Sequence, residues 1–210
     1  MMNRLKKFFR QTARRWSWFL YRRSQVLNKN IKDLIFDGVK LHMGCGDKKL
    51  KGYVNIDIVP TEGSDLVMDV AKGLHLIPSD TALEIRLESV FEHFYRYQQP
   101  KVLQHFHRIL KANGRLVIKW LPDFEAIIEA YEKMSPGAVG NRFDLFNVYR
   151  LTHGDPIPEN SPQQLHKDIF TKDSIRALLT EQGFLIERIE KEFFPGEEVA
   201  VSLNIIASKK

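Results

Sequence analysis

Two glycines and an aspartate between residues 41 and 58 have the spacing of a ligand-binding turn. Gly44 and Gly46 follow the apolar segment 39–43, and a turn without side chains lets the backbone come close to a ligand. Asp57 stands at the end of the next apolar segment, where a carboxylate can accept two hydrogen bonds from a ribose diol. The three residues predict a strand, a glycine turn and a second strand that together bind a nucleotide-like ligand.

A dinucleotide-binding dehydrogenase is the competing interpretation of this glycine pattern. That fold requires a third glycine where Lys49 stands and an acid about 20 residues after the turn, whereas Asp57 follows Gly46 by 11 residues. Only residues 47–52 separate the turn from the next strand, which is too few for a crossover helix. A ligand carboxylate at this turn is therefore expected to be held by backbone amides, with Lys48 or Lys49 nearby.

Beyond the turn, the chain resembles the class I S-adenosylmethionine-dependent methyltransferases, in particular a small group whose core reads LxLGCG…GWVNVD…D…LP…LEH…RVLKPGGRL…PD. The similarity runs over residues 39–121. It implies S-adenosylmethionine as the cofactor, with Asp57 on the ribose and with Asp69 and the backbone of Val70 on the adenine. The cofactor-binding residues expected from the resemblance are His42, Gly44, Cys45, Gly46, Asp57, Ile58, Asp69, Val70, Glu88 and Ser89.

The segment LESVFEH, residues 87–93, is expected to lie over the methyl-transfer site. The resembled group has approximately ASHVLEH there, so Glu92 and His93 match the group while Glu88 and Ser89 differ from it. His93 beside Glu92 is chemically suited to act as a base near neutral pH, and these two are the candidate catalytic residues. The alternative is a structural role in which the pair braces the following segment by hydrogen bonds.

The composition is that of an ordinary globular domain with one cysteine. The 210 residues fit a single domain, and 43% hydrophobic residues suit a folded core. Cys45 has no second cysteine to pair with, and its place in the glycine turn is interpreted as small-residue packing. No Cys/His cluster has the spacing of zinc ligands, so the sequence predicts no metal site and a reducing, cytoplasmic setting.

The basic residues are concentrated at the N-terminus. Residues 1–30 contain nine lysines and arginines and no acid, whereas the rest of the chain carries 23 basic and 26 acidic side chains. The body is therefore mildly acidic despite a net charge of +6, which argues against a nucleic-acid-binding protein. Residues 3–27 repeat apolar and aromatic side chains at helical spacing. This basic amphipathic helix is expected either to lie on a membrane, such as the inner membrane surface, or to pack on its own domain or a second subunit. RNA binding by its basic face is the third and least favoured alternative.

The order of elements predicts an α/β fold with a Rossmann-like, seven-stranded class I methyltransferase sheet. We expect an N-terminal helix and linker over 1–36 and a cofactor-binding domain over 37–210, with a mostly parallel sheet and helices on both of its faces. A strand over 82–88 and a helix over 99–111, ended by Gly114, belong to this pattern. Residues 184–190 and 201–208 are joined too briefly for a crossover helix, so they are expected to form a C-terminal antiparallel hairpin.

Residues 135–166 interrupt the alternation of strands and helices with several glycines and prolines. A long irregular insertion beside the ends of strands is usually functional, so this segment is expected to form a substrate lid. It ends at His166-Lys167, a pair that the resembled group often has after a glycine-containing loop. For His166 and for His153, hydrogen bonding within the loop is the alternative interpretation.

These features together predict methyl transfer to a small-molecule, sugar or lipid-linked acceptor. Strand 82–88 is not followed by the Asn/Asp-Pro-Pro-aromatic tetrapeptide of many amino-methylating nucleic-acid and protein enzymes, which favours such acceptors. A non-catalytic cofactor-binding module, acting as a membrane-tethered or oligomeric partner, is the second hypothesis. The departures at Glu88 and Ser89 support it, and a homo-oligomer is compatible with either function.

Overall fold

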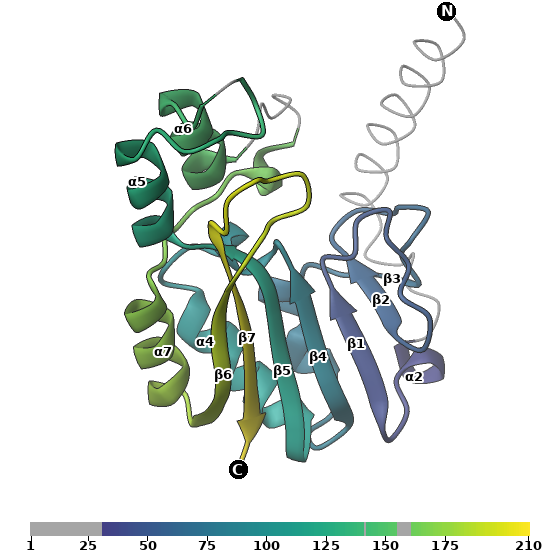
Figure 1. Ribbon diagram of the computed structural model, residues 1–210. Coiled ribbons are helices and arrows are strands. Elements are labelled where there is room, and N and C mark those ends of the chain that lie inside the picture. Colours follow the sequence, from purple (N-terminus) through teal and green to yellow (C-terminus); the bar gives the residue numbers. More distant parts are fainter. Residues whose placement is uncertain (1–30, 141, 155–160) are drawn as a thin grey trace, which may run out of the picture.

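A seven-stranded mixed sheet forms the centre of the computed structural model, which describes residues 31–140, 142–154 and 161–210 (Figure 1). The strand order is β3-β2-β1-β4-β5-β7-β6. The strands are β1 (Val39–Met43), β2 (Val54–Asp57), β3 (Leu66–Val67), β4 (Ala82–Glu88), β5 (Leu110–Pro122), β6 (Phe184–Glu192) and β7 (Ser202–Lys209).

Helices connect or flank these strands. The α-helices are α2 (Ile31–Leu34), α3 (Val70–Gly73), α4 (Gln99–Ile109), α5 (Phe124–Glu132), α6 (Leu145–His153) and α7 (Lys172–Glu181). The described residues also form the short 3₁₀ turns η1 (Leu74–Leu76), η2 (Phe91–His93) and η3 (Pro162–Gln164).

The sheet is parallel except at its C-terminal edge. Strands β1 to β5 pair in parallel, whereas β7 runs antiparallel to both β5 and β6. The C-terminal antiparallel hairpin and the mixed seven-stranded sheet predicted from the sequence are thus confirmed. Because β1 lies between β2 and β4, the strand order reverses there, and the carboxyl ends of these strands border a crevice.

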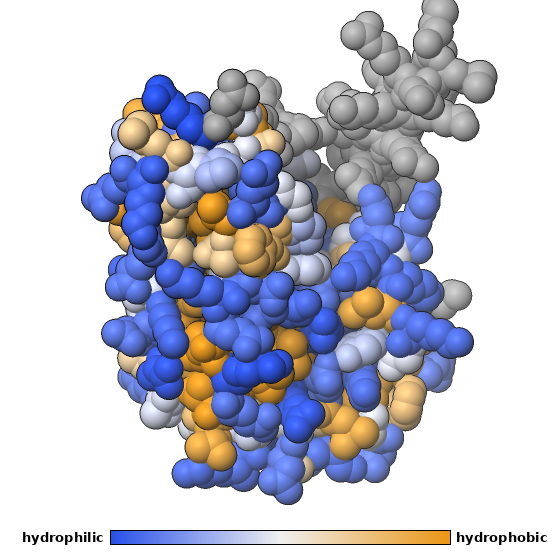
Figure 2. Space-filling model, viewed as in Figure 1, coloured by the Kyte–Doolittle hydropathy of each residue, from blue (hydrophilic) through white to orange (hydrophobic). Residues whose placement is uncertain are grey.

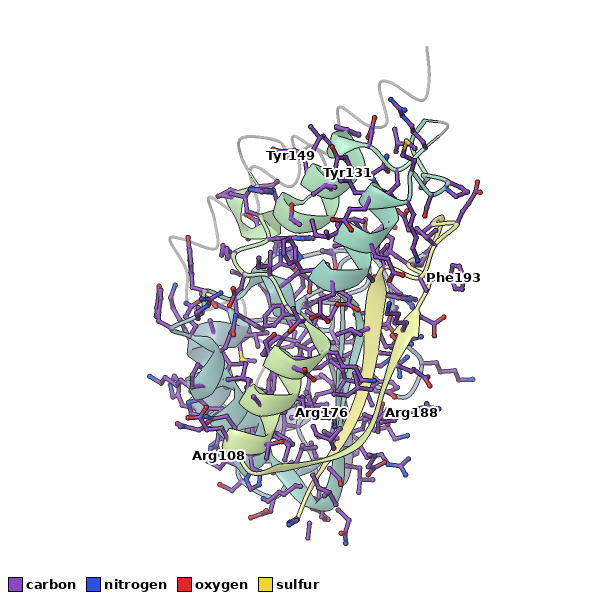
Figure 3. The ribbon with its side chains drawn as sticks, turned by 60° about the vertical axis from the view of Figure 1, so that its left-hand side comes forward. Arg108, Tyr131, Tyr149, Arg176, Arg188 and Phe193 are labelled. Carbon is purple, nitrogen blue, oxygen red and sulfur yellow. The ribbon has the colours of Figure 1, made fainter. Side chains whose placement is uncertain are left out.

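The main hydrophobic core lies on one face of the sheet. Alternate strand residues such as Leu41, Ile85 and Leu116 are fully buried in one cluster with residues of α4 and α7. Figure 1 shows α4 behind the sheet, and Figure 3 shows α7, marked by Arg176, on one side of the strands. Strand side chains therefore stabilise the fold mainly by packing against this single helical layer.

The opposite face of the sheet differs from the expectation that helices would cover both faces. Its strand positions carry charged and polar side chains, including Glu84 and Arg86 on β4 and Arg115 on β5, and none of these is buried. Among the described residues, no helix covers this face, which Figure 2 shows as largely hydrophilic with scattered apolar patches. The short β1–β2 connection explains part of this difference, because it is confirmed to contain no crossover helix.

The predicted end of one helix was wrong, and one segment is more regular than predicted. Helix α4 ends at Ile109, and β5 begins at once with Leu110, so Gly114 lies inside the strand instead of ending the helix. The insertion expected to be irregular contains a regular helix, α6, whose first turn is capped by the Asp144 carboxylate. Asp144 accepts hydrogen bonds from the amides of Phe146 and Asn147, which satisfies two free donors of that turn.

The predicted N-terminal amphipathic helix, residues 3–27, lies outside the described residues. Within the described parts of the chain, no helix has the length and apolar composition needed to cross a bilayer.

Candidate functional site

A cavity of about 340 Å³ lies at the carboxyl ends of β1 to β4. Its walls come from segments far apart in the chain: the glycine turn after β1, the end of β2, the start of α3 and the loop after β4. It is lined by Gly44, Gly46, Asp57, Ile58, Asp69, Val70, Ala71, Lys72, Ser89, Val90, His93, Phe94, Tyr95, Gln98, Gln163, Gln164 and Lys167. This is the crevice in which open α/β sheets bind their ligands.

The backbone conformation of the turn favours glycine at positions 44 and 46. Gly44 and Gly46 have φ angles of +66° and +54°, in the left-handed region that disfavours other residues. A Cβ atom on Gly44 would lie 2.5 Å from Cγ2 of Val90, whereas one on Gly46 would meet no protein atom within 4 Å. Gly44 is therefore required by packing, and Gly46 leaves open space on the cavity side of the turn.

Asp57 fixes the turn and lines the cavity. Its Oδ2 accepts a hydrogen bond from the Gly46 amide over 2.8 Å, and its Oδ1 accepts one from the Val59 amide over 3.0 Å. A carboxylate has about four acceptor positions, so two bonds leave capacity for a ligand.

A loop that sequence reasoning missed supports the turn from behind. The hydroxyl of Thr61 donates a hydrogen bond to the carbonyl oxygen of Gly46. A Cβ on Gly63 would lie 2.8 Å from that same carbonyl oxygen, so the two backbones are in close contact. The only signal in the sequence was the glycine at position 63, in a segment that resembled an ordinary turn.

Asp69 and Val70 also line the cavity, as the resemblance implied. Asp69 is the N-cap of α3, and its carboxylate accepts a hydrogen bond from the Ala71 amide over 3.0 Å. Its other oxygen forms an ion pair with Lys72 at 2.9 Å. The carboxylate is therefore held at the cavity wall by its own helix.

Three of the expected cofactor-binding residues do not line the cavity. His42 lies on the polar face of the sheet with its Nδ1 3.0 Å from Oδ1 of Asn55, and burial lowers the pKa of its imidazole. Cys45 is buried, and burial together with the nearby Asp57 raises the pKa of its thiol to about 12, which suits packing and not nucleophilic attack. Glu88 is engaged by Lys48 at 2.5 Å and by Arg86 at 2.7 Å.

Ser89 is one of the two positions at which the sequence differs from the resembled group. Unlike Glu88, it lines the cavity. Its φ of +52° is unusual for a residue with a side chain, and its amide donates to the carbonyl of Lys119 over 3.0 Å. The hydroxyl is buried and has no hydrogen-bond partner among the described residues. Strained backbone of this kind is often found at functional sites.

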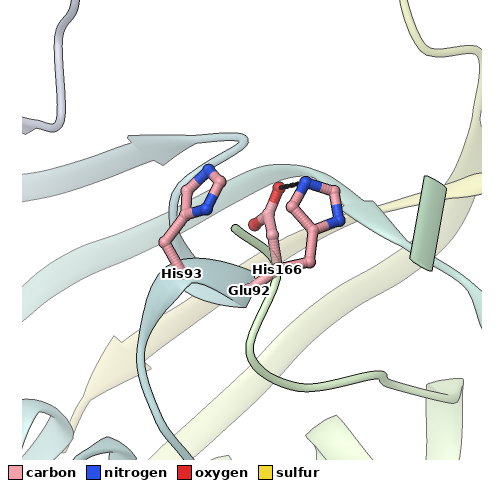
Figure 4. A group of neighbouring side chains, drawn as sticks. All are labelled: Glu92, His93 and His166. Atoms are coloured by element: carbon pink, nitrogen blue, oxygen red, sulfur yellow. Dashed lines mark ion pairs between the residues drawn. The ribbon is translucent and has the colours of Figure 1, made fainter. Parts of the chain in front are cut away.

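The structure brings Glu92 and His93 together with His166 (Figure 4). Glu92 is 1% exposed, neither of its carboxylate oxygens has a hydrogen-bond partner in the described residues, and burial raises its pKa to about 8. His166 Nε2 lies 4.0 Å from Glu92 Oε1. Of the three side chains, only His93 lines the cavity.

Both imidazoles of this group are oriented by backbone carbonyls. His93 Nδ1 lies 3.0 Å from the carbonyl oxygen of Leu165, and His166 Nδ1 lies 2.9 Å from that of Leu151. Burial lowers the pKa of His93, and burial together with His93 lowers the pKa of His166 to about 4. Both rings are therefore neutral at pH 7.

Lys167 completes this side of the cavity. Its amide donates to the Glu92 carbonyl over 2.8 Å, and its Nζ donates to the His93 carbonyl over 3.0 Å. Burial lowers the pKa of its ammonium group. Lys167, the residue just after the predicted lid of residues 135–166, thus contacts η2 directly, although the sequence offered only the His166-Lys167 pair as a signal.

Comparison with known proteins gives matches to solved structures only: no protein-family model and no curated protein matches the chain. A methyltransferase described as S-adenosylmethionine-dependent, from Thermotoga maritima, is 17% identical, with a TM-score of 0.54 and coverage of 100% of both chains. Another from Methanosarcina mazei is 16% identical, with a TM-score of 0.53, over 87% of this chain and 98% of that one. A third from Archaeoglobus fulgidus is 15% identical, with a TM-score of 0.53, over 85% and 89% of the two chains. The chain therefore has the fold of the class I S-adenosylmethionine-dependent methyltransferases.

Proposed function

We propose that the protein transfers a methyl group from S-adenosylmethionine to an acceptor bound in the same cavity. The observation that carries the proposal is the convergence of the glycine turn, Asp57 and the Ser89–His93 segment on one cavity at the reversal of strand order. The fold of the solved methyltransferases supports it.

The residues present fit the cofactor. The space beside Gly46 admits a ligand against the backbone, and the Asp57 carboxylate retains acceptor capacity for a ribose diol. Asp69 and Val70 line the same cavity, which supports the role on the adenine that the resemblance implies for Asp69 and the Val70 backbone. Lys48 and Lys49 are held in ion pairs with Glu88 and Asp65. The amides of Cys45, Gly46 and Lys48 already donate to protein oxygens, so the open space beside Gly46 is assigned to the cofactor's carboxylate.

The sulfonium of S-adenosylmethionine supplies an electrophilic methyl group, so the protein's main contributions are alignment and exclusion of water. An acceptor lone pair forms the new bond to carbon as the sulfur–carbon bond breaks, and sulfur keeps the bonding pair. A hydroxyl or protonated amine acceptor must also lose a proton. We assign acceptor activation to the segment of Glu92 and His93, in which His93 faces the cavity and Glu92 lies behind it.

The acceptor is proposed to be a small molecule, a sugar or a lipid-linked group. The mildly acidic body of the chain and the missing amino-methylation tetrapeptide disfavour nucleic acid. The basic, aromatic segment 3–27 supports peripheral contact with an anionic membrane from the cytoplasmic side, which would place the cavity near lipid-linked substrates.

Calorimetry with S-adenosylmethionine and S-adenosylhomocysteine tests the proposal first, and a methyl-transfer assay over a panel of acceptors tests it second. We expect saturable binding of both compounds and transfer to at least one class of acceptor. Absence of binding would overturn the proposal. Binding without transfer to any acceptor would favour the alternative of a non-catalytic cofactor-binding module.

A further inference from the structure

We propose that Glu92, His93 and His166 form a binding site for a divalent transition-metal ion at the edge of the cavity. One carboxylate and two imidazoles offer ligand atoms that all lie within 4.8 Å of one another (Figure 4). The sequence predicted no metal site, because His166 is 73 residues from His93 and the spacing of zinc motifs is local.

The carboxylate is the strongest argument for an ion. Glu92 is 1% exposed, and both of its oxygens are buried with no hydrogen-bond partner in the described residues. A buried carboxyl group without partners is costly, since the group loses its hydration and gains nothing in return. A cation bound beside Glu92 would take the place of the carboxyl proton and supply the missing partner.

The imidazoles have the arrangement that metal ligands require. Each ring uses Nδ1 for a backbone carbonyl, that of Leu165 for His93 and that of Leu151 for His166. Such a bond fixes the tautomer and is the usual outer support of a metal-ligating histidine. On His166 it leaves Nε2, the atom that faces Glu92, to bind the ion, whereas the His93 ring must turn toward Glu92 to bring its Nε2 to the same ion. His166 Nε2 is directed at Glu92 Oε1, from which it is 4.0 Å away.

The backbone already joins the two segments that carry the ligands. The Lys167 amide donates to the Glu92 carbonyl over 2.8 Å, so the residue after His166 is tied to η2. Ligand atoms around tetrahedral zinc lie about 3.3 Å apart, so the side chains must move inward by about 1 Å when an ion binds. The Lys167 ammonium, which donates to the His93 carbonyl, is a nearby positive charge that opposes this binding.

The donor set selects the class of ion. Two imidazoles and one carboxylate suit zinc or another first-row transition ion, whereas magnesium and calcium prefer oxygen ligands. Three protein ligands leave at least one coordination position open, as in catalytic zinc sites. His93 lines the cavity, so the proposed site borders the space in which the acceptor is proposed to bind.

This role rests on the proposed methyl transfer and narrows its substrate class to acceptors with a hydroxyl or amine that can bind a metal. A hydroxyl bound to the ion loses its proton to water more readily, because a bound cation lowers its pKa. The oxygen lone pair then forms the bond to the methyl carbon as the sulfur–carbon bond breaks. In this arrangement Glu92 and His93 would activate the acceptor as ligands of the ion, and water would take the proton.

The test is calorimetric titration of the full-length, chelator-treated protein with Zn²⁺ alone and with Mg²⁺ alone. The variants are Glu92→Gln, which keeps the side-chain volume, and His166→Ala, with His105→Ala on α4 as the matched control outside the cluster. Circular dichroism and thermal melting check that each variant is folded. S-adenosylmethionine affinity is measured separately on the same samples.

We expect wild type and His105→Ala to bind one equivalent of Zn²⁺ in preference to Mg²⁺. Both cluster variants should lose at least about tenfold in Zn²⁺ affinity, since removing even a group that supports a metal ligand costs about 10–100-fold. Failure of wild type to bind Zn²⁺ at micromolar concentrations, or equal binding by Glu92→Gln, would overturn the metal site. Because Zn²⁺ binding is measured without cofactor, a failure of S-adenosylmethionine binding would instead count against the proposed function.

Discussion

The amide of Gly46 donates a 2.8 Å hydrogen bond to Oδ2 of Asp57, joining the turn after β1 to the end of β2. The same carboxylate that shapes the glycine turn therefore stands at the cavity wall, where it can also receive a ligand. Local structure and binding are coupled through one side chain. A change at Asp57 should affect both the turn and the cofactor.

Replacing Asp57 with Ala should weaken S-adenosylmethionine binding by about ten- to a hundredfold. Hydrogen bonds to a charged acceptor contribute about 1.5–3 kcal/mol, and each 1.4 kcal/mol corresponds to a factor of ten in affinity. Calorimetry measures the dissociation constant, and Asp57→Asn, which keeps one oxygen acceptor, should lose less. An unchanged dissociation constant in Asp57→Ala would remove Asp57 from the binding site.

Alanine at Gly44 and alanine at Gly46 should have different effects. Both substitutions place a side chain at positive φ, which costs about 1–2 kcal/mol of backbone strain. Gly44→Ala also forces a Cβ against Val90, so it should lower the melting temperature more. Gly46→Ala meets no protein atom and should chiefly reduce cofactor affinity.

Thermal melting and calorimetry on the two variants separate these effects. If Gly46→Ala binds S-adenosylmethionine as tightly as wild type, the space beside Gly46 does not belong to the cofactor. The two variants would then differ in stability alone.

Sequence reasoning located the binding turn and the sheet because both are local signals. The strand Ala82–Glu88 and the turn from Gly44 to Gly46 follow from apolar runs and glycine spacing over a few residues. The polar sheet face was also encoded locally, since Glu84, Arg86 and Glu88 alternate with buried residues on β4. The expectation of helices on both faces came from the fold class instead of from this alternation.

The Glu92–His166 pairing could not be read from the chain. It depends on how residues 163–167 return to η2 after α5 and α6, and no local pattern specifies that path. The unmet hydrogen bonds of Glu92 are likewise a property of packing, visible only when all its neighbours are placed.

A buried ion pair between α6 and the loop that joins β6 to β7 should contribute to the stability of the fold. Arg150 on α6 pairs with Glu197, and their side chains are only 10% and 1% exposed. Arg150→Met leaves the Glu197 carboxylate buried without its cation, so it should lower the free energy of unfolding by about 3–5 kcal/mol. Urea unfolding measures this quantity.

The double variant Arg150→Met with Glu197→Gln is the control, because it removes the carboxylate charge as well. It should recover part of the lost stability. If Arg150→Met lowers the free energy of unfolding by less than about 1 kcal/mol, the pair behaves like an exposed ion pair and is accessible to water.

The basic segment 3–27, outside the described residues, should bind anionic vesicles if its aromatic side chains face a membrane interface. Binding of the full-length protein to the vesicles should weaken as the salt concentration rises. The attraction between nine cationic side chains and the anionic headgroups is screened within a Debye length of about 8 Å at physiological ionic strength. Replacing Trp16 and Phe19 with Ser should abolish sedimentation with vesicles and leave cofactor affinity unchanged, whereas Gln11→Ala should alter neither.

If the double variant instead lowers the melting temperature or changes the oligomeric state, and wild type never sediments, the segment packs on protein. A soluble small molecule or sugar would then replace a lipid-linked group as the leading acceptor.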